Sequence, residues 1–215
     1  MIGGKQMKTF YKKIALMLCV CSMFAMQSYA QRVPDKLHFT IDWQMNAPYS
    51  TDFADKISGW GMNFEGTYDV SPRWALGAFI NFHTNHKYIG RQTIQLSPTE
   101  SLTTDQQRSA YQLPFGFTSA YTVYPGKVVK PYIGVKLGAV YTRYTTYYGT
   151  GGVYDNPWGF YASPEIGLKI FPCKSKRFGF HVAGYYSFMT NQAETLTGEG
   201  IDGQNNVGFR LGVIF

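Results

Sequence analysis

The sequence predicts an all-β fold, a closed antiparallel up-and-down β-barrel of about eight strands. Large apolar residues alternate with small or polar ones in segment after segment, which is the pattern of a strand with two different faces. The links between these segments are alternately short and long. The chain also ends on such a strand, since Val207, Leu211 and Phe215 lie on one face and Asn206 and Arg210 on the other.

Each expected strand is justified by apolar residues at every second position. In chain order these series run from Leu37 to Met45, Trp60 to Tyr68, Trp74 to Phe82, Tyr111 to Val123, Ile133 to Tyr141, Phe160 to Ile170, Phe178 to Phe188 and Val207 to Phe215. The strands are therefore expected at 37–46, 59–69, 73–84, 110–123, 132–144, 159–171, 178–189 and 205–215.

The links indicate how the strands are connected. The short, turn-rich links are 70–72, 124–127 and 172–177, and the longer polar links are 47–58, 85–109, 145–158 and 190–205. Because consecutive strands run in opposite directions, this alternation places every long link at one end of the barrel. An even number of strands returns the chain to the other end, the side of the short turns.

The composition of the two faces separates a membrane barrel from a soluble one. A soluble barrel of the lipocalin type turns its apolar face inward and needs a densely charged outer face. Here the second face is mostly Gly, Ala, Ser, Thr and Asn, which suits the narrow interior of an eight-stranded barrel. Aromatic residues near the strand ends predict two belts at the membrane boundaries. The turn-side belt is Tyr68, Trp74, Tyr121, Phe178 and Phe215, and the loop-side belt is Trp60, Phe82, Tyr111, Tyr141, Phe160 and Phe188.

The N-terminus carries the features of a secretion signal. Four lysines precede the apolar run 14–26, and Ser28-Tyr29-Ala30 supplies the small residues of a cleavage site. The run is too short for a spanning helix, which needs roughly 20 apolar residues. We therefore expect a signal peptide over 1–30, cleaved near Ala30, and one barrel domain over 31–215.

Composition excludes some classes of partner. Four of the 20 basic residues lie in the signal region, so the formal net charge of +7 overstates the basicity of the barrel, and no nucleic-acid partner is expected. Cys173 is the only cysteine after the expected cleavage site, so an internal disulfide is excluded.

The chain from 31 to 215 resembles the small eight-stranded bacterial outer-membrane β-barrel family, of the OmpX, OmpA-domain and OmpW kind. The residues that carry the resemblance are the alternating terminal strand, the stretch 131–139 and the stretch 163–168. The resemblance implies an outer-membrane location in a Gram-negative-type bacterium, contact with outer-membrane lipid, and insertion by the barrel-assembly machinery. In that family the terminal aromatic, here Phe215, is part of the assembly signal.

Charges on the inward face form the candidate site. They are three acids and three bases, Asp42, Glu65, Lys136, Glu165, Lys169 and Arg210. Charges held away from water are very costly unless they are paired. We expect an ionic network that fills the lumen and blocks an open pore, with the alternative that some members are hydrated at a rim.

Catalytic and metal signals are weak. His83 and His86 lie at the loop end of the third strand, without a serine or carboxylate at a spacing that compels a triad, and are expected to be hydrated rim histidines. His38 and His181 are interpreted as lumen or turn-side fillers. Glu194, Glu199 and Asp202 could bind a divalent cation, but a solvated acidic loop is the preferred interpretation. No catalytic residue, cofactor or metal is predicted.

The expected function is that of a non-enzymatic integral outer-membrane barrel, an anchor whose outward loops interact at the surface. Residues 85–109 are the first candidate for a partner site, because 88–96 could extend the strands as an exposed edge. The main alternative is a channel for small solutes or hydrophobic compounds of the OmpW kind, with a side exit at Pro114 or Pro164, where pairing is weakened. Two less favoured functions are those of a lipid-modifying enzyme and of a subunit of a larger envelope machine.

Overall fold

The computed structural model describes residues 36–49, 51–97, 99–149, 151–172, 178–194 and 200–215. The expected signal peptide and its cleavage site lie outside these residues, as do Cys173 and Glu199. No helix among the described residues combines the length and the apolar character needed to span a membrane.

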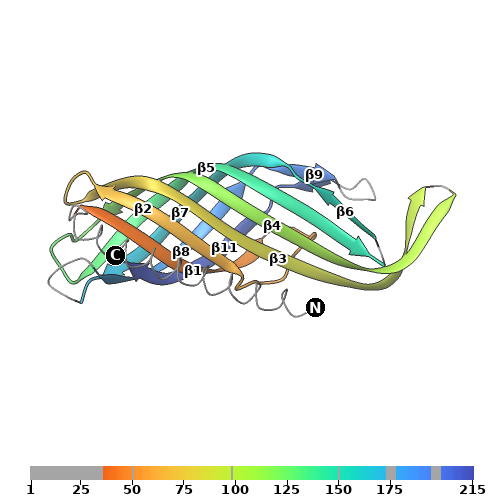
Figure 1. Cartoon of the computed structure of the whole chain (residues 1–215), viewed down its shortest axis with the longest axis horizontal. Helices are drawn as coiled ribbons and strands as arrows, with labels where there is room; N and C mark the ends of the chain where they lie inside the picture. The colour runs from red at the N-terminus through yellow and green to blue at the C-terminus, as the bar shows by residue number, and fades with distance from the viewer. Residues whose placement is uncertain (1–35, 50, 98, 150, 173–177, 195–199) are drawn as a thin grey trace, which may run out of the picture. The chain divides into compact units, whose positions relative to one another are not determined.

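Eight strands form the wall of the barrel (Figure 1). They are β1 (Leu37–Tyr49), β2 (Gly61–Asp69), β3 (Trp74–Ser97), β4 (Glu100–Thr122), β5 (Val129–Tyr148), β7 (Trp158–Ile170), β8 (Gly179–Met189) and β11 (Asn205–Ile214). A short strand, β6 (Gly151–Asp155), continues β5 in a hairpin, and β9 (Gln192–Glu194) pairs with β10 (Gly200–Asp202) in the last long link.

The barrel is closed. Each wall strand pairs antiparallel with the next, and β1 pairs with β11 from Thr40 opposite Ile214 to Tyr49 opposite Asn205. Beyond the strand end, Phe39 and Phe215 exchange two backbone hydrogen bonds of 3.0 and 2.8 Å. The predicted all-β, up-and-down, eight-stranded barrel is confirmed.

The distribution of polar and apolar residues is the reverse of that in a soluble protein. Large apolar side chains cover the outer wall, and Trp60 and Phe117 are each 78% exposed. The buried interior instead holds Asp, Glu, Lys, Arg, His, Asn and Gln. A continuous apolar outer surface of this extent is stable only against another apolar medium, which here is the hydrocarbon of a membrane.

Two strands are much longer than expected. β3 continues to Ser97 and β4 begins at Glu100, so the link 85–109 is a long β-hairpin, in which 88–96 extends the strands as the sequence allows (Figure 1). The apolar alternation ends with the membrane, but the backbone ladder does not need it, and β-branched residues such as Thr93 and Ile94 favour the extended chain. β5 is also longer, ending at Tyr148.

Candidate functional site

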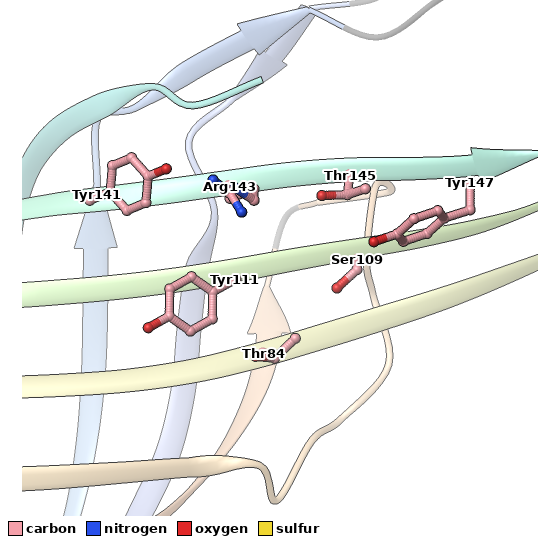
Figure 2. Close-up of a pocket in the computed structure, with 7 residues that line it drawn as sticks. All are labelled: Thr84, Ser109, Tyr111, Tyr141, Arg143, Thr145 and Tyr147. Carbon is pink, nitrogen blue, oxygen red and sulfur yellow. The ribbon is translucent and has the colours of Figure 1, made fainter. Parts of the chain in front are cut away.

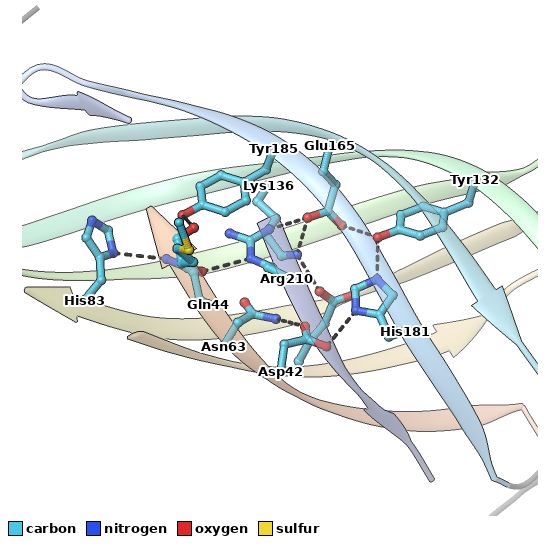
Figure 3. A network of polar contacts seen from close by, with 12 residues as sticks. Asp42, Gln44, Asn63, His83, Tyr132, Lys136, Glu165, His181, Tyr185 and Arg210 are labelled. Atoms are coloured by element: carbon cyan, nitrogen blue, oxygen red, sulfur yellow. Dashed lines mark hydrogen bonds and ion pairs between the residues drawn. The ribbon is translucent and has the colours of Figure 1, made fainter. Parts of the chain in front are cut away.

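The half of the lumen nearer the short turns holds an ionic cluster, to which β2, β5, β7 and β11 each contribute one side chain (Figure 3). The Lys136 ammonium lies 2.7 Å from a carboxylate oxygen of Glu65 and 2.7 Å from one of Glu165. The Arg210 guanidinium also pairs with Glu165. Lys136 and Arg210 are fully buried. Alternation turns all four side chains inward, because each shares the small-residue face of its strand.

Asp42 joins this cluster through a relay of hydrogen bonds. His181 Nδ1 lies 2.7 Å from Asp42 Oδ1, and His181 Nε2 lies 2.6 Å from the Tyr132 hydroxyl. That hydroxyl donates to Glu165 Oε1 at 3.0 Å. Asn63 donates to the other Asp42 oxygen at 2.8 Å. The structure therefore brings Asp42, Glu65, Lys136, Glu165 and Arg210 into one connected network.

Lys169 is not brought into the network. It is only partly buried and lies toward the turn end of β7, with its ammonium 5.1 Å from the centre of the Tyr132 ring. It forms no ion pair with any residue that the structure describes. Its face of the strand is inward, but its height differs from that of the other charges, and alternation carries no information on height.

An apolar layer lies next to the ionic cluster, on its side toward the long links. Phe79, Val140, Tyr161 and Met189 pack together in the lumen, with the Phe79 and Tyr161 rings 5.7 Å apart. Phe79 is opposite Gly116 in the β3–β4 ladder, and Tyr161 is opposite Gly138 in the β5–β7 ladder. Glycines at these positions leave room for the two rings to lie across the interior.

The half of the lumen nearer the long links is filled by amide side chains around His83. Gln44 lies 3.2 Å from His83 Nδ1, and the Asn206 amide lies 3.4 Å from His83 Nε2. The expectation of a hydrated rim histidine is wrong, because His83 is fully buried among these amides. No serine or carboxylate in the described part of the chain hydrogen-bonds to His83. His86 is exposed, and its side chain is on the outer face of β3.

Two of the long links pack against the inner wall beyond the amide layer. Phe53 and Ala54 cluster with Ala110, Tyr144, Ala193 and Ile201, and the Phe53 and Tyr144 rings are 5.1 Å apart. Lys87 donates to Asp55 at 2.8 Å, and this hydrogen bond lowers the pKa of the Asp55 carboxyl. The sequence analysis does not predict this apolar cluster at the loop end of the lumen. The apolar pair Phe53-Ala54 within a polar link is the feature that could have indicated it.

The remaining histidine and acidic candidates are brought into no metal-binding cluster among the described residues. His38 Nε2 lies 3.2 Å from Asp69 Oδ2 near the turn side. Among the described residues, no group of three or more His, Cys, Asp or Glu side chains is placed to hold a metal ion.

A family model and one solved structure with a TM-score above 0.5 support the barrel architecture. A family model described as the outer membrane protein beta-barrel domain matches residues 16–215. Neisserial surface protein A is 12% identical, with a TM-score of 0.51, over 83% of this chain and 96% of that chain. Ail, the attachment invasion locus protein of Yersinia pestis, is 14% identical, with a TM-score of 0.47, over 83% and 97%. Outer membrane protein OprG from Pseudomonas aeruginosa is 13% identical, with a TM-score of 0.44, over 82% and 94%. No curated protein sequence matches the chain.

Proposed function

Because the chain belongs to the outer membrane protein β-barrel domain family, we propose that it is a non-enzymatic anchoring protein whose outward segments carry surface interactions. The observation that carries this proposal is the filled lumen. Fully buried Lys136 and Arg210 and the Phe79–Tyr161 ring pair occupy the interior where a pore would need continuous water. The complete burial of His83 among amide side chains, with no serine or cysteine of the described residues hydrogen-bonded to it, supports a non-enzymatic role.

The β3–β4 hairpin is the proposed interaction surface. The β4–β5 pairs end at Gln106 opposite Tyr148, whereas β3 and β4 remain paired with each other as far as Ser97 opposite Glu100. The hairpin therefore projects past its neighbours in the barrel wall with both outer edges outside the barrel ladder. An edge of this kind can accept a strand from a partner protein, and loops on a rigid scaffold commonly carry recognition.

Single-channel recording in planar bilayers tests the anchoring role. We expect no steady conductance from the inserted protein, with a heat-modifiability gel confirming that the barrel is folded. A steady open pore in the folded protein would contradict the proposal.

Breaks in two ladders favour a channel as the second candidate. The β3–β4 ladder passes from Ile80–Phe115 to His83–Gln112, skipping Pro114, and the β7–β8 ladder skips Pro164 in the same way. Proline has no N–H to donate. The inward Asn81 amide and Ser163 hydroxyl beside these breaks have no hydrogen-bond partner among the described residues. Such weak seams suit a lateral exit for a hydrophobic compound.

Uptake of a fluorescent hydrophobic solute into vesicles separates the two functions. A side exit at Pro114 predicts that Pro114→Val, which restores an N–H, slows uptake. Equal uptake by the variant, the wild type and protein-free vesicles would remove the channel candidate and leave the anchor.

A further inference from the structure

An open groove of about 450 Å³ lies on the outer wall, across three neighbouring strands (Figure 2). β3 contributes Thr84, β4 contributes Ser109 and Tyr111, and β5 contributes Tyr141, Arg143 and Tyr147. The lining holds many hydroxyl groups and a single cation, and it contains no acidic side chain. This polar lining differs from the apolar outer wall on the turn side of the groove.

The groove lies immediately beyond the apolar band. Phe82, Tyr111 and Tyr141 are the loop-side belt aromatics of β3, β4 and β5. The next residues on the same outer face, in the direction of the long links, are Thr84, Ser109 and Arg143. Belt aromatics mark the level where hydrocarbon meets the polar headgroups. The groove therefore lies in the headgroup layer on the side of the long links.

Arg143 is held in place with part of its guanidinium free. Its Nε donates to Asn156 Oδ1 at 3.0 Å, and the Tyr141 hydroxyl donates to the same oxygen at 2.9 Å. The ring of Tyr154 lies 5.7 Å from the guanidinium carbon. The terminal amino groups of this exposed arginine donate to no described residue. Tyr111 is directly opposite Arg143 in the ladder, so its side chain shares the outer face.

We propose that this groove binds the phosphate group of an outer-leaflet lipid headgroup. A guanidinium presents paired N–H donors that match two phosphate oxygens, and neighbouring hydroxyls add further donors. The absence of acidic side chains from the lining removes the main source of repulsion. The inference deepens the proposed anchoring role, since it rests on the barrel spanning the membrane, and it names the lipid chemistry that the outer wall recognises.

Lipid retention measured by native mass spectrometry tests the assignment. The processed full-length protein is placed in phosphatidylcholine nanodiscs that contain diphosphoryl lipid A, and is then released into detergent. We expect the wild type to retain lipid A and Arg143→Gln to bind it about tenfold more weakly, the usual effect of losing charge-assisted hydrogen bonds. Tyr111→Phe, which keeps the ring, should weaken retention less.

The matched control is Arg73→Gln. Arg73 is also exposed and bonded to a belt tyrosine, with 3.2 Å between its guanidinium and the Tyr121 hydroxyl, but it lies on the turn side. Retention by this variant should equal that of the wild type. Equal loss in both variants, or none in folded Arg143→Gln, would overturn the proposal.

Two further arms identify the ligand. Lipid A stripped of both phosphates should not be retained, and its undiminished retention would refute phosphate recognition. Millimolar inorganic phosphate should displace little lipid A, and full displacement would assign the groove to free phosphate rather than to a headgroup. Because a heat-modifiability gel scores barrel formation separately, a failed lipid assignment leaves the anchoring role standing.

Discussion

At the scale of single residues, the contacts of His181 predict which of its ring nitrogens carry hydrogen. The Tyr132 hydroxyl donates its only proton to Glu165, so its oxygen must accept from His181 Nε2, while the Asp42 carboxylate accepts from Nδ1. This pattern of partners predicts hydrogen on both ring nitrogens of His181. A His181 ring with both hydrogens would, together with Lys136 and Arg210, balance the charges of Asp42, Glu65 and Glu165.

Nitrogen NMR of histidine-labelled protein in bilayers checks this charge. At neutral pH we expect two protonated ring nitrogens for His181 and a neutral ring for His83, whose nitrogens both face amide side chains. A single protonated nitrogen on His181 would contradict the assignment, and Asp42→Asn should weaken the imidazolium signature.

Arg210→Met tests the energy of the ionic cluster. Removing this cation leaves Glu165 buried with one fewer partner, and breaking a buried pair costs about 3 kcal/mol. Urea unfolding in lipid vesicles should therefore show a lower midpoint. Lys169→Met is the control, because Lys169 is partly exposed and outside the network, and its midpoint should scarcely move. Equal stability of both variants would argue that the cluster does not stabilise the fold.

The sequence is sufficient to decide which side chains point inward, but not which of them meet. Alternation turns Asp42, Glu165 and Lys169 to the same side of the wall. The tilt of the strands and their register then set the height of each residue, and that information lies in pairing between distant segments. Sequence reasoning therefore predicts a filler at His181 and an ionic partner at Lys169, although the contacts of these two residues are the other way round.

At the scale of the elements, strand positions follow from the apolar period and strand ends do not. The period persists only where the wall faces lipid, so it places the ends of β3 and β4 near the belt and leaves 88–96 only as a candidate extension. Backbone hydrogen bonds carry the hairpin onward regardless of side-chain polarity.

The β1–β11 seam depends on a residue without a side chain. A Cβ on Gly212 would overlap the Asp42 carboxylate and the Ile41 carbonyl, whereas nothing lies within 4 Å of a Cβ on Gly184 of β8. We expect Gly212→Val to destabilise the barrel by about 2 kcal/mol or more, through overpacking. On a heat-modifiability gel it should show a larger unfolded band, and Gly184→Val should resemble the wild type. Full folding of Gly212→Val would show that the seam can relax.

Phe215 has two separable roles. Its backbone closes the seam with Phe39, and its side chain is the predicted assembly signal. Phe215→Ala keeps the backbone bonds, so we expect near-normal refolding in detergent but less folded protein in the outer membrane of cells. Normal assembly in cells would remove the signalling role.

At the scale of the whole molecule, the signal peptide and the barrel are still predicted to separate near Ala30. Intact mass measurement of protein extracted from outer membranes should give a chain that begins at Gln31. A mass that includes the apolar run 14–26 would instead indicate a retained N-terminal anchor.

The pairing of β1 with β11 also sets the order of events in biogenesis. The first strand to leave the ribosome must wait for the last before the ring can form, so the barrel cannot be completed during synthesis. Until then the apolar side chains of every strand remain exposed to water. The polypeptide should therefore depend on a periplasmic holdase chaperone to reach its membrane without aggregating.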